Sequence, residues 1–106
     1  MRSEARILII EDDEGIGANL QRAFASDDID VEWGRTAAEA ASLASKHRPD
    51  LVLLDLGLPD GDGLDLCRAL LAAQPALPII MLTARDAEID VVVGLDSGAV
   101  DYVTKT

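Results

Sequence analysis

Two short runs made only of apolar residues, Ile7–Ile10 and Leu51–Leu54, constrain the fold of this chain most. An unbroken apolar run of this length is typical of a strand covered on both faces, which is the usual situation in a parallel sheet. Acidic residues follow each run directly: Glu11, Asp12 and Asp13 follow the first run, and Asp55 follows the second. Strands covered on both faces need helices on both sides of the sheet, so the chain should alternate strands with helices.

The rest of the sequence fits this alternation. Shorter strand patterns occur at Val31–Trp33, Pro78–Leu82 and Val100–Val103. Helical spacing of apolar residues is seen in Ile16, Leu20, Ala23 and Phe24; in Ala40, Leu43 and Ala44, after a capping box at Thr36–Glu39; in Leu64, Cys67, Leu70 and Leu71; and around residues 87–96. With no internal repeat or linker, we predict one α/β domain over residues 1–106. It has the form (βα)₄β, a doubly wound parallel sheet of five strands.

Composition excludes several functional classes. Twenty acidic against nine basic residues give a net charge of −11, so this domain is not expected to bind nucleic acid directly. No apolar run reaches the roughly 20 residues of a membrane helix, and the first residues lack the features of a signal peptide. The single cysteine, Cys67, excludes an internal disulfide. We therefore expect a cytoplasmic protein, in which the acidic charge serves either solubility or a bound cation.

Residues that can perform chemistry stand at the ends of four predicted strands. Glu11 and Asp12 follow the first strand, Asp55 the third and Thr83 the fourth, while Lys105 ends the fifth. The carboxyl ends of these strands should share one rim of the sheet, where ligands bind in doubly wound folds. Packed carboxylates repel one another unless a cation neutralises them, and Mg²⁺ binds carboxylate, water and phosphate oxygens. Alone, each residue would more often be a cap or a surface charge; together they indicate a carboxylate that carries a phosphoryl group.

Four stretches resemble the receiver domains of two-component response regulators, and the resemblance covers the whole chain. The stretches are Ile7–Asp13, Leu51–Gly63, Met81–Ala84 and Gly98–Lys105. The resemblance implies a flavodoxin-like fold and a phosphorylation-dependent switch that catalyses only its own phosphorylation and dephosphorylation. The phosphoryl donor would be a sensor histidine kinase. Leu56–Arg68 is most similar to the winged-helix transcription-factor branch, which implies control of an output domain or a downstream protein.

The resemblance also implies a role for each matching residue. Asp55 would accept the phosphoryl group, and Lys105 would pair with the phosphoryl oxygens. The ligands of Mg²⁺ would be Glu11, Asp12, Asp55 and the backbone carbonyl of Gly57. Thr83 would move to bond the phosphoryl group, and Tyr102 would turn inward, so that the region from Thr83 to Tyr102 changes conformation.

The sequence departs from this family in two places. Thr106 follows Lys105, where the family usually has proline. The chain also stops where the family's last helix would begin, so we expect a truncated receiver. Apolar side chains under that helix should be uncovered, either Ile7, Ile9, Leu51 and Leu53 or those on the alternate faces of the same strands. Such a surface favours a homodimer, an exchanged element, or cover from residues beyond Thr106.

Two other functional classes fit part of the pattern. A phosphotransferase or phosphatase of the haloacid-dehalogenase type also forms an aspartyl phosphate, but these enzymes resemble one another in a second aspartate where this chain has Gly57. A flavodoxin-like nucleotide binder needs a phosphate loop after the first strand, where Glu11–Glu14 would repel phosphate. His47 is interpreted as a solvated helix-end residue, and Cys67 as a core residue.

Overall fold

The computed structural model describes residues 5–55, 63–83 and 101–104, with the backbone alone described for Thr83 and for residues 101–104. Five strands form one parallel sheet in the order β2-β1-β3-β4-β5. Their bounds are β1 Ala5–Ile10, β2 Ile29–Gly34, β3 Leu51–Asp55, β4 Ile79–Thr83 and β5 Asp101–Thr104. The predicted parallel sheet of five strands is therefore confirmed. Asp55 and Thr83 are the last residues of their strands rather than the first residues after them.

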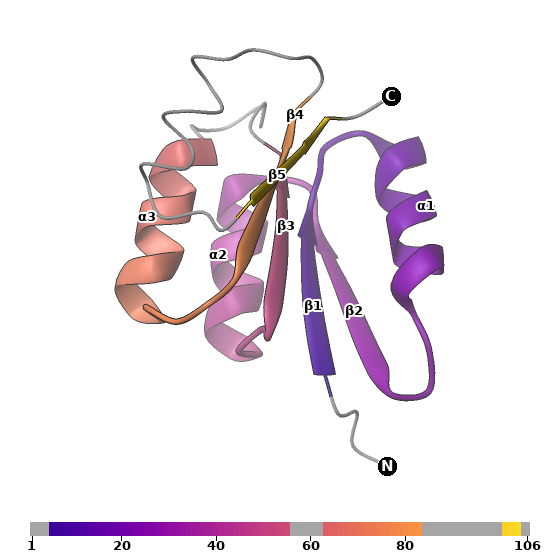
Figure 1. Cartoon of the computed structure of the whole chain (residues 1–106), viewed down its shortest axis with the longest axis horizontal. Coiled ribbons are helices and arrows are strands. Elements are labelled where there is room, and N and C mark those ends of the chain that lie inside the picture. The colour runs from indigo at the N-terminus through magenta and orange to yellow at the C-terminus, as the bar shows by residue number, and fades with distance from the viewer. Residues whose placement is uncertain (1–4, 56–62, 84–100, 105–106) are drawn as a thin grey trace.

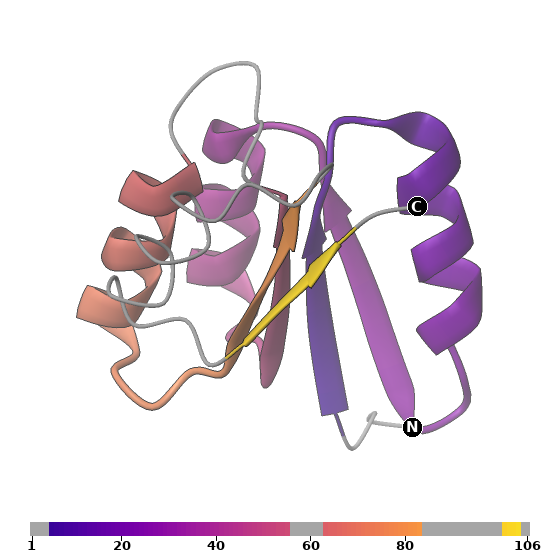
Figure 2. The same cartoon turned by 45° about the horizontal axis from the view of Figure 1, so that its top comes forward.

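Three helices of the described chain cover the two faces of this sheet. They are α1 Glu14–Phe24, α2 Ala37–Lys46 and α3 Gly63–Ala73. Helix α1 packs against β1 and β2 on one face, whereas α2 and α3 pack together on the opposite face (Figures 1 and 2). None of the three has the length and hydropathy needed to cross a membrane. The helix predicted around residues 87–96 lies outside the described residues.

The first two helices begin at capping residues, and the capping box in the sequence predicts the second of these helix starts. The Asp13 carboxylate accepts a hydrogen bond from the Ile16 N–H at 3.0 Å, at the start of α1. The Thr36 hydroxyl accepts one from the Glu39 N–H at 3.1 Å, at the start of α2. Each cap bonds an N–H that has no partner within its own helix. Both helix starts are thus fixed by local sequence.

The larger core layer lies between the sheet and helices α2 and α3. Its buried members from the strands are Leu8, Ile10, Val52, Leu54, Ile79 and Met81, and those from the two helices are Ala40, Leu66, Cys67 and Leu70. Cys67 is fully buried, which confirms its predicted place in the core. Burial raises the pKa of the Cys67 thiol, although the nearby Arg68 guanidinium acts in the opposite direction.

The second core layer, on the face of α1, contradicts the exposure expected for a chain without the family's last helix. Ile7, Ile9 and Leu53 are buried, with 6%, 0% and 5% of their surface exposed, and only Leu51 is half-buried. Leu20 and Trp33 pack against this layer. The expectation is therefore wrong for three of the four side chains, because α1 and the indole at the end of β2 lie on the same face.

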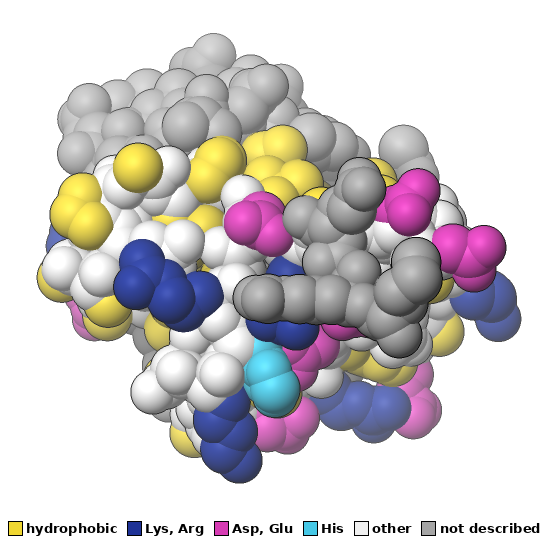
Figure 3. All heavy atoms as spheres, turned by 90° about the horizontal axis from the view of Figure 1, so that it is seen from below, with side chains coloured by type: hydrophobic (Ala, Val, Ile, Leu, Met, Phe, Trp, Pro, Cys, Tyr) yellow, Lys and Arg dark blue, Asp and Glu magenta, His cyan; other side chains and the backbone are white. Residues whose placement is uncertain are grey.

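The edge of the sheet at the amino ends of the strands carries mixed charge. Arg6 Nη2 lies 3.6 Å from Asp30 Oδ2, and Arg6 Nε lies 3.5 Å from Glu32 Oε1. Seen from this edge, basic and acidic side chains lie side by side with the histidine (Figure 3). His47 is exposed at the C-cap of α2, as predicted. This edge therefore carries charges of both signs.

Candidate functional site

The strand order places the ends of β1 and β3 side by side. After β1 the chain forms β2 on one side of β1 and then β3 on the other side. The direction in which strands are added to the sheet therefore reverses between β1 and β3. Ile10 pairs with Leu54 in the parallel register. Asp55, the last residue of β3, therefore lies level with Glu11, the first residue after β1. Ligand sites of doubly wound sheets form at such a reversal.

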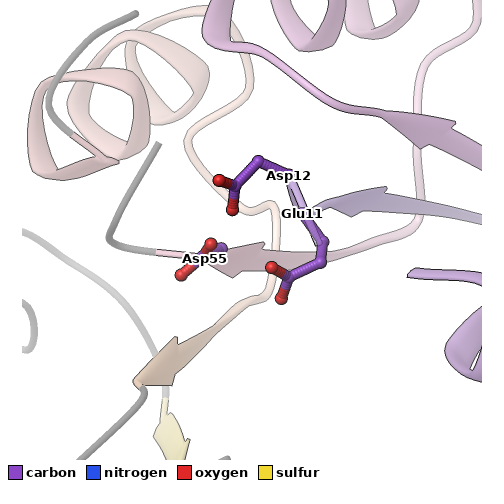
Figure 4. Close-up of side chains that lie close together, drawn as sticks. All are labelled: Glu11, Asp12 and Asp55. Atoms are coloured by element: carbon purple, nitrogen blue, oxygen red, sulfur yellow. The ribbon is translucent and has the colours of Figure 1, made fainter. Parts of the chain in front are cut away.

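Three carboxylates meet at this point. One carboxylate oxygen from each of Glu11, Asp12 and Asp55 lies within 4.8 Å of the other two. Figure 4 shows the three side chains grouped around the end of β3. Glu11 and Asp55 are buried, at 0% and 4% exposure, whereas Asp12 is exposed. The structure thus brings together the three acidic residues that the sequence singles out.

Hydrogen bonds from β2 and from the start of α1 fix the position of Glu11. Its N–H donates to the Gly34 carbonyl at 3.1 Å, and its own carbonyl accepts the Trp33 indole N–H at 2.8 Å. Its Oε1 atom accepts the Asp13 N–H at 3.2 Å. Asp13 in turn caps α1. The acidic site is therefore held between the end of β2 and the first turn of α1.

The donor set fits a small divalent cation. Burying carboxylates at the end of a sheet is costly unless a positive charge accompanies them. Three carboxylates supply the hard oxygen donors that Mg²⁺ prefers, and Mg²⁺ typically keeps several water ligands beside one or two direct carboxylate bonds. The exposure of Asp12 leaves one side of the cluster open to water and to an arriving anionic group.

The remaining predicted site residues are placed only in part. Thr83 ends β4, next to Asp55 in the sheet, because Asp55 pairs with Leu82. Tyr102 lies in β5 opposite Met81. The structure describes only the backbone of Thr83 and Tyr102, not their side chains. Gly57 and Lys105 lie entirely outside the described residues.

The comparison with protein families decides the identity of this site. Residues 7–106 match the family described as "Response regulator receiver domain". This chain belongs to the response regulator receiver domains. Such a domain is a phosphorylation-dependent switch of two-component signalling rather than a classical enzyme. The resemblance found in the sequence is confirmed, and the match gives no support to the haloacid-dehalogenase alternative.

Relatives of known name support the same assignment. Response regulator MprA of Mycobacterium sp. (strain KMS) is 42% identical over 100 residues, which are 94% of this chain and 44% of that protein. Transcriptional regulatory protein CreB of Escherichia coli (strain K12) is 42% identical over 99 residues, which are 93% of this chain and 43% of that protein. The receiver domain described here thus spans less than half the length of these relatives.

Solved receiver domains share the fold. The non-phosphorylated HemR receiver domain from Leptospira biflexa has a TM-score of 0.87 and 40% identity, covering 95% of this chain and 82% of that chain. The BeF3-activated N-terminal receiver domain of Klebsiella pneumoniae RstA has a TM-score of 0.85 and 37% identity, covering 95% of this chain and 86% of that chain. The flavodoxin-like fold predicted for this receiver is therefore confirmed.

Sequence reasoning missed Trp33, which contacts the acidic site, and Gly17, which contacts Trp33. Trp33 was recognised only as part of a strand, although its indole bonds the backbone of Glu11. Gly17 was not singled out, although it lies against the same indole. The sequence offered only two signals: the chain has a single tryptophan, and the first helix contains glycine. Neither signal indicates that Trp33 and Gly17 meet.

Proposed function

We propose that this receiver domain accepts a phosphoryl group on Asp55 from a phosphohistidine of a sensor histidine kinase, with Mg²⁺ as cofactor. The ligands of the ion would be Glu11, Asp12, Asp55 and the backbone carbonyl of Gly57. The observation that carries the proposal is the convergence of three carboxylates within 4.8 Å at the point where strand order reverses. Asp55 is buried and is the last residue of β3, in the middle of the sheet.

The reaction is a transfer of the phosphoryl group between two residues. A bond forms between an Asp55 carboxylate oxygen and phosphorus, while the phosphorus–nitrogen bond of the phosphohistidine breaks and its imidazole leaves with the electron pair. Bound Mg²⁺ would supply positive charge to the phosphoryl oxygens. Glu11 and Asp12 hold acidic oxygens beside Asp55 for this purpose, and Lys105, next after Thr104 of β5, would pair with the phosphoryl oxygens.

Phosphorylation would act on an output through the last strands of the sheet. Thr83 ends β4 beside the end of β3, which suits a hydroxyl that bonds the new phosphoryl group. Tyr102 lies on the neighbouring β5 and would turn inward in the same step. The conformation of the region from Thr83 to Tyr102 would then shift from one existing state toward another.

The output would be transcriptional control. CreB is named a transcriptional regulatory protein, and it extends well beyond the part that this domain matches. We therefore propose that the domain controls a winged-helix output domain or a downstream protein. With a net charge of −11 the receiver itself would not bind nucleic acid, and it would act in the cytoplasm without contact with a membrane.

That the chain forms a homodimer or exchanges an element stays a prediction. The structure gives it less support than the sequence alone did. Burial of Ile7, Ile9 and Leu53 removes most of the uncovered apolar surface from which it was argued. Sedimentation velocity over a hundredfold range of concentration tests it. A sedimentation coefficient that rises with concentration would support association, whereas a constant monomer value would refute it.

Phosphorylation chemistry tests the proposed function directly. The purified domain is incubated with Mg²⁺ and acetyl phosphate, or with a phosphorylated sensor kinase, and its mass is measured. One added phosphate is expected that is stable in acid and labile in base, and Asp55→Asn should not acquire it. Asp65→Asn, which changes an exposed aspartate of α3, is the matched control and should be labelled like the parent. Undiminished labelling of Asp55→Asn would overturn the assignment.

A further inference from the structure

The indole of Trp33 bonds directly to the backbone of the acidic site. Trp33 is the only tryptophan of the chain, and its Nε1–H donates to the Glu11 carbonyl at 2.8 Å. This carbonyl belongs to the peptide unit that joins Glu11 to Asp12, so the bond sets the plane from which both acidic side chains leave the backbone. The neighbouring Gly34 carbonyl accepts the Glu11 N–H at 3.1 Å. The end of β2 therefore holds Glu11 on both sides of its Cα atom.

A glycine in α1 makes room for this indole. A Cβ atom at position 17 would overlap Trp33 Cζ2 and Cε2 and would lie 2.7 Å from Nε1. Contacts this short do not occur, and a ring cannot yield like the end of a flexible side chain. Glycine within a helix is less favourable than alanine, so Gly17 is unfavourable for α1 taken alone. The missing side chain at Gly17 leaves the space in which the indole reaches Glu11.

The indole also contacts the guanidinium of Arg35. The Arg35 guanidinium carbon lies 4.5 Å from the centre of the Trp33 ring, a distance typical of a cation–π contact. Arg35 Nη1 lies 3.1 Å from Glu14 Oε1, in the first turn of α1. The ring thus contacts both α1 and a guanidinium that is itself tied to α1. These contacts restrict its orientation toward Glu11.

We infer that Trp33 is a positioning residue for the Mg²⁺ ligands, and that Gly17 is required for it to act. The inference rests on the proposed function, because it assigns Trp33 a role toward the ion that Glu11, Asp12 and Asp55 would hold. Residues that orient metal ligands without touching the metal commonly govern metal affinity. The alternative is that Trp33 only fills the core layer next to α1, where it also packs.

Removal of the indole N–H separates these two roles. Trp33→Phe keeps an aromatic ring in the core but has no donor, and benzothienylalanine at position 33 keeps the full ring shape with sulfur in place of N–H. We expect both to bind Mg²⁺ about three- to tenfold more weakly than the parent, measured by titration calorimetry on the folded protein. The single indole N–H signal in the ¹⁵N spectrum of the parent should shift as Mg²⁺ is added.

Gly17→Ala tests the same contact while keeping tryptophan. It should weaken Mg²⁺ binding by a similar factor, since the methyl group displaces the ring from Glu11. In a Trp33→Phe background it should cause no further loss, because the contact is already absent. Asn19→Ala is the control in the same helix: the Asn19 side chain is exposed and accepts a hydrogen bond from Arg22, so Mg²⁺ affinity should stay at the parent value.

Failure of this inference can be told from failure of the proposed function. If the parent domain binds no Mg²⁺ and accepts no phosphate, the proposed function fails and this inference fails with it. If the parent binds Mg²⁺ but the benzothienylalanine protein and Gly17→Ala bind it equally well, Trp33 is only a core residue and this inference alone is overturned. Urea denaturation of each variant verifies that affinities are compared between folded proteins.

Discussion

Replacement of Asp55 by asparagine should stabilise the Mg²⁺-free domain, even though it removes the proposed phosphoacceptor. Asp55 and Glu11 are both buried, and their carboxylate oxygens lie within 4.8 Å of each other. Two unit charges at this separation repel by about 3.5 kcal/mol at an effective dielectric constant of 20, and by about 0.9 kcal/mol in bulk water. Because the cluster is open on the side of Asp12, we expect a gain of about 1–3 kcal/mol in the free energy of unfolding.

Mg²⁺ should reduce the difference in stability between the two proteins. An ion that binds only the folded state at about 100 times its dissociation constant adds about 2.7 kcal/mol. The parent should gain this amount, whereas Asp55→Asn should gain much less because one ligand has lost its charge. Asparagine therefore stabilises the domain without the ion, and its advantage shrinks or disappears when the ion is present.

Urea denaturation at pH 8, with a chelator or with Mg²⁺, measures both effects. For a domain of this size each kcal/mol also shifts the melting temperature by about 4–8 °C. Asp28→Asn is the matched control, because it makes the same charge change in the turn between α1 and β2, where the side chain is exposed. Equal gains in the two variants would show that net charge is responsible. A loss of stability in Asp55→Asn without Mg²⁺ would refute the reasoning.

Three further predictions concern the switch and the core. Thr83→Ala should accept phosphate but respond weakly, and hydrogen exchange that stays unchanged over residues 84–103 of the parent on adding beryllofluoride would contradict the proposed switch. Burial raises the pKa of the Cys67 thiol, so its contribution to stability should be complete below the ordinary thiol pKa of about 8.5 and should fall as pH rises above it. Urea denaturation between pH 7 and pH 10 should show this fall in the parent and not in Cys67→Ala. Leu70→Ala, in the same buried layer, should cost about 2–5 kcal/mol by the same measurement, and a loss below about 1 kcal/mol would mean that the layer is loosely packed.

Much of this receiver could be predicted from local patterns. The apolar runs at residues 7–10 and 51–54 became two strands of the sheet, and Thr36 caps the helix that its capping box predicted. These features depend on side-chain period and on hydrogen bonds between near neighbours, and both can be read along the chain. The order of the acidic residues, each at the end of a strand, also predicted which carboxylates would meet.

The tertiary structure decided the features that depend on how distant segments meet. The register that pairs Ile10 with Leu54 sets Glu11 level with Asp55, and the packing of α1 buries Ile7 and Ile9, which sequence reasoning had left uncovered. The bond from Trp33 to Glu11 spans 22 residues and depends on the glycine that admits the ring. A local pattern shows which face of an element is apolar, whereas the element that covers this face is chosen by packing across the whole chain.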